Sequence, residues 1–208
     1  MCDSCAGKVE YISEPICKRC GKPIQKEEQE YCKDCTENQF EYEQGRSLWI
    51  HRGLVKKSIY QFKYHNRRVY GQWYAQELFR LYGHKLKEWE IDLIIPIPLH
   101  KRKKRSRGYN QAEIIAKKLG KLAHIPVDTK TVVRTRNTKA QKHLDNQERR
   151  RNLKSAFCVN KMWRGAQNVL LIDDIYTTGA TINEVATILK EKGVQKVWFL
   201  TISIGQGF

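Results

Sequence analysis

Four consecutive apolar residues, 169–172, run directly into two carboxylates and then into a loop of small hydroxyl residues. An apolar run this short, bounded by polar residues, is typical of a buried strand rather than a helix. We predict a helix over 179–192, so the loop joins the carboxyl end of a strand to a helix N-terminus. Such a connection indicates an open α/β sheet, and open α/β sheets bind ligands at the carboxyl ends of their strands.

The loop is a candidate phosphate site, because backbone N–H groups at a helix N-terminus suit a phosphate monoester. We predict that the phosphate is held by Thr177, Thr178, Gly179, Ala180 and Thr181. Asp173 and Asp174 are too acidic to contact a phosphate, but they are suited to accept hydrogen bonds from ribose hydroxyls. The alternative is a helix cap with incidental acids. The adjacent carboxylates followed by Thr-Thr-Gly-x-Thr argue against that alternative.

The rest of the chain alternates between strand and helix patterns. Apolar runs predict strands at 91–97, 131–133, 169–172 and 197–204, and helical spacing predicts helices at 109–122 and 179–192. A short strand at 47–50 precedes helices that extend to about residue 90. This alternation predicts a doubly wound, mostly parallel α/β sheet.

Six of the seven cysteines form three Cys-x-x-Cys pairs. The pairs Cys17/Cys20 and Cys32/Cys35 have the spacing of a zinc ribbon, so we predict a tetrahedral four-thiolate site for a structural Zn²⁺. A redox dithiol, inert cysteines and an iron–sulfur site are the alternatives. The third pair, Cys2/Cys5, lacks partners and would supply accessory thiols. Cys158 stands alone, and we interpret it as a small buried apolar side chain.

Charge divides the chain in the same way as the cysteines. Residues 1–45 carry six Lys and Arg against ten Asp and Glu, whereas the rest carries 33 against 12, within a net charge of +17. We therefore predict a Cys-rich module at 1–40 and a basic α/β domain at 41–208 with a polyanionic partner. A merely solubilising role for the basic residues is the alternative. With no long apolar run and no signal peptide, we expect a cytoplasmic protein without membrane insertion.

Four motifs in order resemble one known family. The segment 173–181 is similar to the phosphoribosyl pyrophosphate (PRPP) signature of type I phosphoribosyltransferases. It is preceded by Pro-x-Pro-Leu-His at 96–100, Arg-Gly-Tyr-Asn-Gln at 107–111, and Arg-Thr-Arg-x-Thr-x-x-Gln-x-x-Leu at 134–144 with Glu-Arg-Arg-Arg-Asn at 148–152. Together with the cysteine module, these motifs resemble the ComF/GntX competence family, from the first cysteines to the last strand. Longer members carry four Cys-x-x-Cys pairs, so either the true start lies upstream or the first ribbon has been lost.

The resemblance implies a type I phosphoribosyltransferase-like fold that binds PRPP with Mg²⁺. It implies a pyrophosphate loop at 101–107, within an anion site that we assign to His100, Lys101, Arg102 and Arg107, and a mobile lid at 134–152. It also implies a role in natural transformation, in which the protein handles single-stranded DNA together with a DNA-translocating helicase. We expect the basic clusters to follow strands of one sheet and to bind DNA through Lys103, Lys104, Arg105, Arg136, Lys139 and Arg150, with Tyr109 or Trp163 stacking on bases.

The alternative is an active phosphoribosyltransferase in nucleotide metabolism or salvage. The chain has no recognisable hood to select the incoming nucleophile and no assignable catalytic base. The strongly basic body favours DNA handling, because a small-molecule enzyme needs only a local basic pocket. The intact phosphate loop favours a retained phosphoribosyl ligand under either interpretation.

Overall fold

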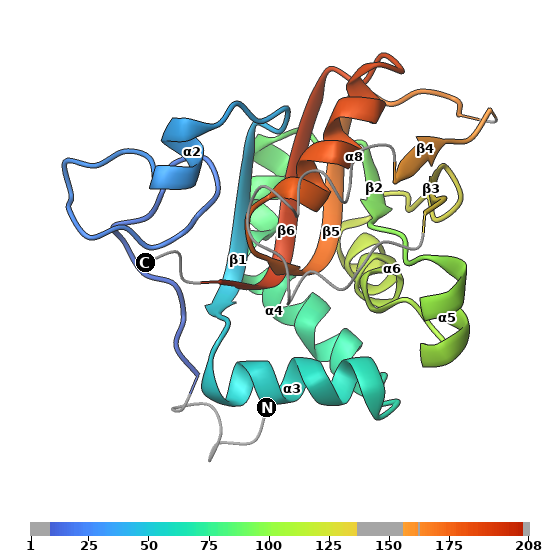
Figure 1. The fold of residues 1–208 in the computed structure, drawn as a ribbon, viewed down its shortest axis with the longest axis horizontal. Helices are drawn as coiled ribbons and strands as arrows, with labels where there is room; N and C mark the ends of the chain where they lie inside the picture. The colour runs from blue at the N-terminus through green and yellow to red at the C-terminus, as the bar shows by residue number, and fades with distance from the viewer. Residues whose placement is uncertain (1–8, 137–155, 162, 206–208) are drawn as a thin grey trace.

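The computed structural model describes residues 9–136, 156–161 and 163–205. Its centre is a four-stranded sheet in the order β1 (Gln44–Ile50), β6 (Lys196–Ile204), β5 (Asn168–Tyr176) and β2 (Leu93–Pro96). All three strand pairs are parallel, with Leu171 opposite both Ile95 and Phe199 (Figure 1). The parallel sheet and its helices confirm the predicted mostly parallel α/β fold.

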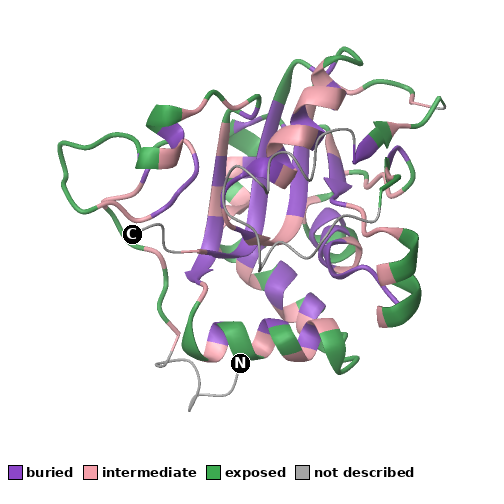
Figure 2. Ribbon diagram, in the orientation of Figure 1, coloured by how far each residue is buried: buried purple, intermediate pink, exposed green. Residues whose placement is uncertain are grey.

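Helices cover both faces of this sheet, so its strands are apolar almost throughout. On one face lie α3 (Gly53–Tyr64), α4 (Val69–Glu88) and α6 (Gln111–Ala123), and on the other lies α8 (Ala180–Lys190). Along β5, Leu170 and Ile172 join the core beneath α4 and α6, whereas Val169 and Leu171 join the core beneath α8. Figure 2 shows the resulting buried centre.

The Arg-Gly-Tyr-Asn-Gln motif has a structural explanation at the junction of two helices. Gly108 ends α5 (Lys101–Arg107) with a φ of 77°, a left-handed conformation that favours glycine. Asn110 caps α6 by accepting from the Ala112 N–H, and its Nδ2 donates to the Ile97 carbonyl at 3.0 Å. The Tyr109 hydroxyl donates to the Phe62 carbonyl from a buried position. Most of this motif therefore fixes α5 and α6 against β2 and α3.

The Cys-rich segment packs against the edge of the sheet at β1. It contains the short helix α2 (Lys33–Glu37), and its four described cysteines belong to the same buried cluster as Phe199 of β6. The Gly45 N–H donates to the Arg19 carbonyl at 2.7 Å. The division of the chain at residue 40 stays a prediction.

Four expectations about local structure were wrong. Residues 101–107 form helix α5 rather than a loop, because Lys and Arg are good helix formers and His100 caps the first turn. Strand β5 continues through both carboxylates to Tyr176, because its pairing with β6 extends to Ile204. β3 (Val132–Arg134) pairs with β4 (Phe157–Val159) in a separate antiparallel sheet, so the basic segments do not follow strands of one sheet. Cys158 is exposed, because it alternates with the buried Phe157.

No helix in the described parts of the chain is both long enough and apolar enough to cross a membrane.

Candidate phosphate pocket and metal site

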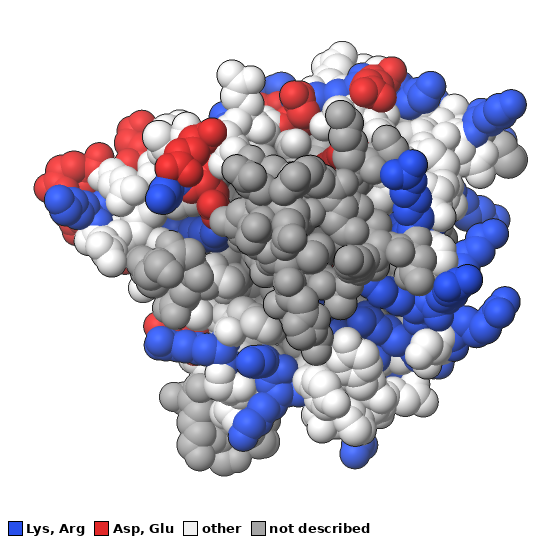
Figure 3. Space-filling view, viewed as in Figure 1, with Lys and Arg blue, Asp and Glu red and all other residues white. Residues whose placement is uncertain are grey.

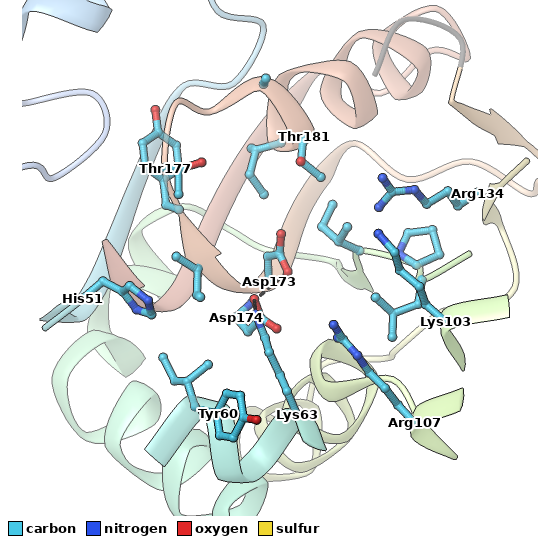
Figure 4. Close-up of a pocket in the computed structure, with 18 of the residues that line it drawn as sticks. His51, Tyr60, Lys63, Lys103, Arg107, Arg134, Asp173, Asp174, Thr177 and Thr181 are labelled. Carbon is cyan, nitrogen blue, oxygen red and sulfur yellow. Dashed lines mark hydrogen bonds and ion pairs between the residues drawn. The ribbon is translucent and has the colours of Figure 1, made fainter. Parts of the chain in front are cut away.

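A cavity of about 560 Å³ opens at the carboxyl ends of β5 and β2. Its walls come from distant parts of the sequence: the β5–α8 loop, helix α3, helix α5 and strand β3 (Figure 4). This is the edge at which open parallel sheets bind ligands. The polar side chains that line it are His51, Lys56, Tyr60, Lys63, Tyr64, Lys103, Arg107, Arg134, Asp173, Asp174, Tyr176, Thr177 and Thr181.

The loop between β5 and α8 has the backbone of an anion site. Gly179 precedes the helix with a φ of 77°, and a Cβ at this position would lie 2.6 Å from the Tyr176 hydroxyl. Among the described residues no side chain caps α8, and its first turn contains no acid. The first N–H groups of this helix therefore face the pocket without competition from a carboxylate. Thr177 and Thr181 line the cavity, whereas Thr178 is buried beside it.

The Thr178 hydroxyl is an unusual feature of this loop. Its Oγ1 is buried and has no hydrogen-bond partner among the described residues. A buried hydroxyl without a partner costs about 1–3 kcal/mol. Because Thr178 does not line the cavity, this cost belongs to the folded loop itself.

The two carboxylates at the floor of the pocket are not equivalent. Asp174 forms an ion pair with Lys63, whose Nζ lies 2.9 Å from Oδ1. The Asp174 N–H donates to Asp173 Oδ1 at 2.8 Å. Burial, and then the charge of Asp174, raise the pKa of Asp173 to about 7. Asp173 is therefore only partly ionised at neutral pH, which lowers the repulsion that the acidic pair would exert on an anion.

This raised pKa makes a testable prediction about stability. An aspartate in an unfolded chain has a pKa of about 3.9, so between about pH 4 and 7 the folded state binds more protons at Asp173 than the unfolded state does. The contribution of Asp173 to the free energy of unfolding should therefore fall as pH rises through this window. Asp173→Asn should remove that contribution. The urea midpoint of the variant should therefore rise relative to that of wild type between pH 5 and pH 8. A constant difference would show that Asp173 titrates normally.

Three cations face this floor from the opposite wall. Lys103 and Arg107 lie one turn apart on α5, and Arg134 comes from β3. Burial lowers the pKa of Lys103, with further lowering from Arg134 and Arg107. Like charges gathered in this way repel one another, and a bound anion would relieve that repulsion. The wall thus has the electrostatics of a phosphate or pyrophosphate site.

The structure brings together only part of the predicted basic set. Lys103 and Arg107 line the pocket, whereas His100 caps α5, and Lys101, Arg102 and Arg105 are exposed residues outside the pocket lining. Lys104 pairs with Glu113 at 3.1 Å. Arg136 is exposed beyond β3, and Lys139 and Arg150, with the rest of 137–155, lie outside the described residues. The ligand roles of all these residues stay predictions.

Figure 3 shows how the exposed charges are distributed on one face of the molecule. Lys and Arg gather toward α5 at the lower right, and Asp and Glu gather over the Cys-rich segment at the upper left. The charge asymmetry of the sequence is therefore also an asymmetry in space.

Sequence reasoning missed the contribution of α3 and the residue after β1. Lys63 pairs with Asp174, and His51 lines the cavity with its Nδ1 2.9 Å from Ser203 Oγ. The only available signal was helical spacing: Lys56, Tyr60 and Lys63 share one side of α3, roughly a third of a turn around the helix from the buried Val55 and Phe62. That pattern marks a polar helix face without saying what it faces.

The two aromatic residues predicted to stack on bases do not line the pocket. Tyr109 is 6% exposed, so the prediction for this side chain was wrong. The motif around it folds back onto α3, and the ring closes the junction between α5 and α6. Trp163 packs against the core beneath α8, where its Nε1 donates to the Lys192 carbonyl at 3.3 Å.

Four of the five described cysteines form a compact four-sulfur cluster. The Sγ atoms of Cys17, Cys20, Cys32 and Cys35 all lie within 4.8 Å of one another, and all four residues are buried. A tetrahedron with Zn–S bonds of about 2.3 Å separates its sulfurs by roughly 3.8 Å, and Cys20 and Cys32 lie 3.6 Å apart. The cluster fits structural zinc. Cys2 and Cys5 lie outside the described residues.

The metal site also touches the phosphate loop through a buried pair of tyrosines. The hydroxyls of Tyr42 and Tyr176 lie 2.7 Å apart, directly beneath Gly179. Lys22, two residues after Cys20, lies over the Tyr176 ring at 6.0 Å and pairs with Asp34 at 2.5 Å. The Cys-rich segment therefore packs against the residue at which the phosphate loop begins.

A double zinc ribbon domain model matches residues 1–36. Competence protein F of Haemophilus influenzae is 29% identical over 202 residues, which cover 95% of this chain and 87% of that protein. Competence protein ComFC of Bacillus subtilis is 28% identical over 201 residues, or 93% and 79% of the two chains. The DNA utilization protein YhgH of Escherichia coli O157:H7 is 37% identical over 111 residues, or 52% of this chain and 48% of that protein.

Among solved structures, a purine phosphoribosyltransferase from Pyrococcus horikoshii aligns with a TM-score of 0.41 and 16% identity. The alignment covers 64% of this chain and 74% of that chain.

The parallel sheet and the four-cysteine cluster together define a parallel α/β protein with an N-terminal zinc ribbon. Over most of its length the chain is a homologue of competence protein F and ComFC, which confirms the family resemblance of its motifs.

Proposed function

We propose that this chain is a DNA uptake factor of natural transformation, which binds single-stranded DNA in the cytosol and retains a pocket for PRPP or ribose 5-phosphate. One observation carries the proposal: the phosphate loop and the cations of α5 share one cavity, and further cations of the same helix continue outside it. A pocket for a small anion needs only Lys103, Arg107 and Arg134. A small anion does not require the three further cations that α5 exposes outside the pocket, Lys101, Arg102 and Arg105. Additional positive charge of this kind suits a polyanion.

Within the pocket, each element has a proposed role. The first turn of α8 with Thr177 and Thr181 binds the 5-phosphate, and Asp173 and Asp174 orient the ribose hydroxyls. Lys103, Arg107 and Arg134 bind the pyrophosphate. Mg²⁺ would accompany PRPP and absorb part of its charge. A DNA-translocating helicase of the uptake machinery is the proposed protein partner.

Active phosphoribosyl transfer is the second candidate function, favoured by the intact acidic pair and loop. Transfer by these enzymes depends on positioning and electrostatic stabilisation of the departing pyrophosphate. Pyrophosphate release from labelled PRPP, tested across a panel of bases and amines, separates turnover from binding alone.

The DNA part of the proposal is tested with a fluorescent 12-nucleotide single strand of mixed sequence. Wild type should raise the anisotropy of this strand at 50 mM salt and lose affinity steeply by 200 mM, because binding releases counterions. Affinity should depend little on sequence. Failure to bind at 50 mM salt would overturn the DNA proposal and leave the transferase candidate.

The loop is tested by replacing threonine with valine, which removes the hydroxyl and keeps the shape of the side chain. Thr177→Val and Thr181→Val should each weaken binding of ribose 5-phosphate, because a hydrogen bond to a charged group contributes about 1.5–3 kcal/mol. Thr187→Val is the matched control, since its hydroxyl donates to the Asn183 carbonyl on the same helix. Calorimetry that finds no ribose 5-phosphate or PRPP binding to wild type would reduce the loop to an inherited scaffold.

A further inference from the structure

Helix α3 carries an exposed aromatic pair at the mouth of the phosphate pocket. Tyr60 and Tyr64 lie one turn apart with ring centroids 4.9 Å from each other, and both line the cavity. Tyr60 is 53% exposed and Tyr64 is 50% exposed, although the apolar face of the same helix is fully covered. His65 extends the pair, with its ring 5.4 Å from that of Tyr60.

The pair is connected to the cationic wall by one residue. The guanidinium of Arg107 lies 4.9 Å from the centroid of the Tyr64 ring, and its NH2 group donates to the Tyr64 hydroxyl at 3.1 Å. Lys56 lines the cavity one turn before Tyr60 on the same helix. Figure 4 shows Tyr60 and Arg107 on the same side of the cavity as Lys63. Exposed rings are thus interleaved with positive charge.

Exposed rings beside cations suit one chemical class of ligand in particular. Proteins that bind single strands combine a positive track for the phosphates with aromatic side chains on which unstacked bases lie. A duplex cannot present its base faces in this way, and a free phosphate has none. An acidic peptide would satisfy the cations but would leave the ring faces of Tyr60 and Tyr64 unused.

We propose that Tyr60 and Tyr64 form the base-stacking platform for single-stranded DNA, with Arg107 joining the stacked bases to the phosphates at the pocket. This inference rests on the proposed single-strand binding and adds where the bases lie. The platform lies on α3. It takes the stacking role that the sequence suggested for Tyr109, which is buried.

The test compares two oligonucleotides of equal charge, a 12-nucleotide thymidine strand and the same backbone with abasic sites. Wild type should bind the thymidine strand at least about tenfold more tightly, since stacking on an aromatic ring contributes strongly for each base. Tyr60→Leu/Tyr64→Leu should bind both strands equally, near the wild-type affinity for the abasic strand. Because the two strands carry the same phosphates, the ratio should persist as salt rises.

Two control variants separate stacking from other effects. Tyr60→Phe/Tyr64→Phe keeps the rings and loses the hydroxyls, so it should retain the preference for the thymidine strand. Tyr31→Leu removes another exposed ring, 40% exposed and located in the Cys-rich segment, and should change nothing. The leucine variant should fold, because Val55, Ile59 and Phe62 still bury the inner face of α3.

Each other outcome has a separate meaning. Equal wild-type affinity for the thymidine and abasic strands would overturn the stacking platform and leave DNA binding standing. If the leucine variant still prefers the thymidine strand over the abasic strand, the bases stack on other residues, and the platform is overturned as well. Wild type that binds neither strand at 50 mM salt would overturn the proposed function and this inference together.

Discussion

Replacing Cys35 with Ser should release the metal and unfold the Cys-rich segment. Structural zinc contributes about 10–16 kcal/mol to the folding of small metal-dependent modules. Residues 9–40 bury few apolar side chains apart from the cysteines, so little else can hold them. The variant should lose about one Zn²⁺ per chain in elemental analysis, and hydrogen exchange should accelerate across 9–40. Cys158→Ser is the control, because Cys158 is exposed and lies outside the cluster.

The same change should weaken the binding of ribose 5-phosphate at a distance. Tyr42, whose hydroxyl pairs with Tyr176 beneath Gly179, belongs to the buried cluster that includes the cysteines. When the metal is lost, the contact of Lys22 with Tyr176 should be lost too, and the phosphate loop should lose its support. We expect calorimetry to show weaker binding in Cys35→Ser than in Cys158→Ser. Full metal content in Cys35→Ser would contradict the four-sulfur site.

The second large effect should come from the exposed face of α5. The triple variant Lys101→Gln/Arg102→Gln/Arg105→Gln removes three charges that lie outside the pocket. If each contacts one phosphate, the slope of log affinity against log salt should flatten by about 0.7 per contact, or about two in total. Affinity at 50 mM salt should fall on the order of 100-fold. Binding of ribose 5-phosphate should be unchanged, because the pocket cations remain.

Two further variants make this comparison specific. Lys103→Gln/Arg107→Gln changes the pocket wall, so it should weaken PRPP binding as well as DNA binding. Lys87→Gln/Lys192→Gln/Lys196→Gln removes the same number of charges as the triple variant, from exposed positions near the opposite end of the sheet. It should leave the salt slope within about 0.7 of wild type. If both triple variants flatten the slope equally, DNA binding depends on net charge and α5 is not its site.

The features that the sequence predicted correctly are those set by local chemistry. The alternation of apolar runs with helical spacing predicted the parallel sheet, since strands buried on both faces must be apolar throughout. Two Cys-x-x-Cys pairs predicted one four-sulfur cluster, because a tetrahedral ion needs four soft ligands at short range. The order Asp-Asp followed by Thr-Thr-Gly placed a turn before α8, where Gly179 has the left-handed backbone that the turn requires. That this turn binds a phosphate stays a prediction.

Tertiary structure alone decided which distant side chains share the pocket. Lys63 meets Asp174 across more than half of the sequence, and Arg134 reaches the cavity from a sheet that is separate from the central one. Local patterns also misjudged exposure: Tyr109 is buried and Cys158 is exposed, because packing between elements determines which face of a short segment is covered. The basic segment 101–107 became a helix whose two sides differ. Lys103 and Arg107 face the pocket and Lys101, Arg102 and Arg105 do not, because one helical turn separates residues that face the same way.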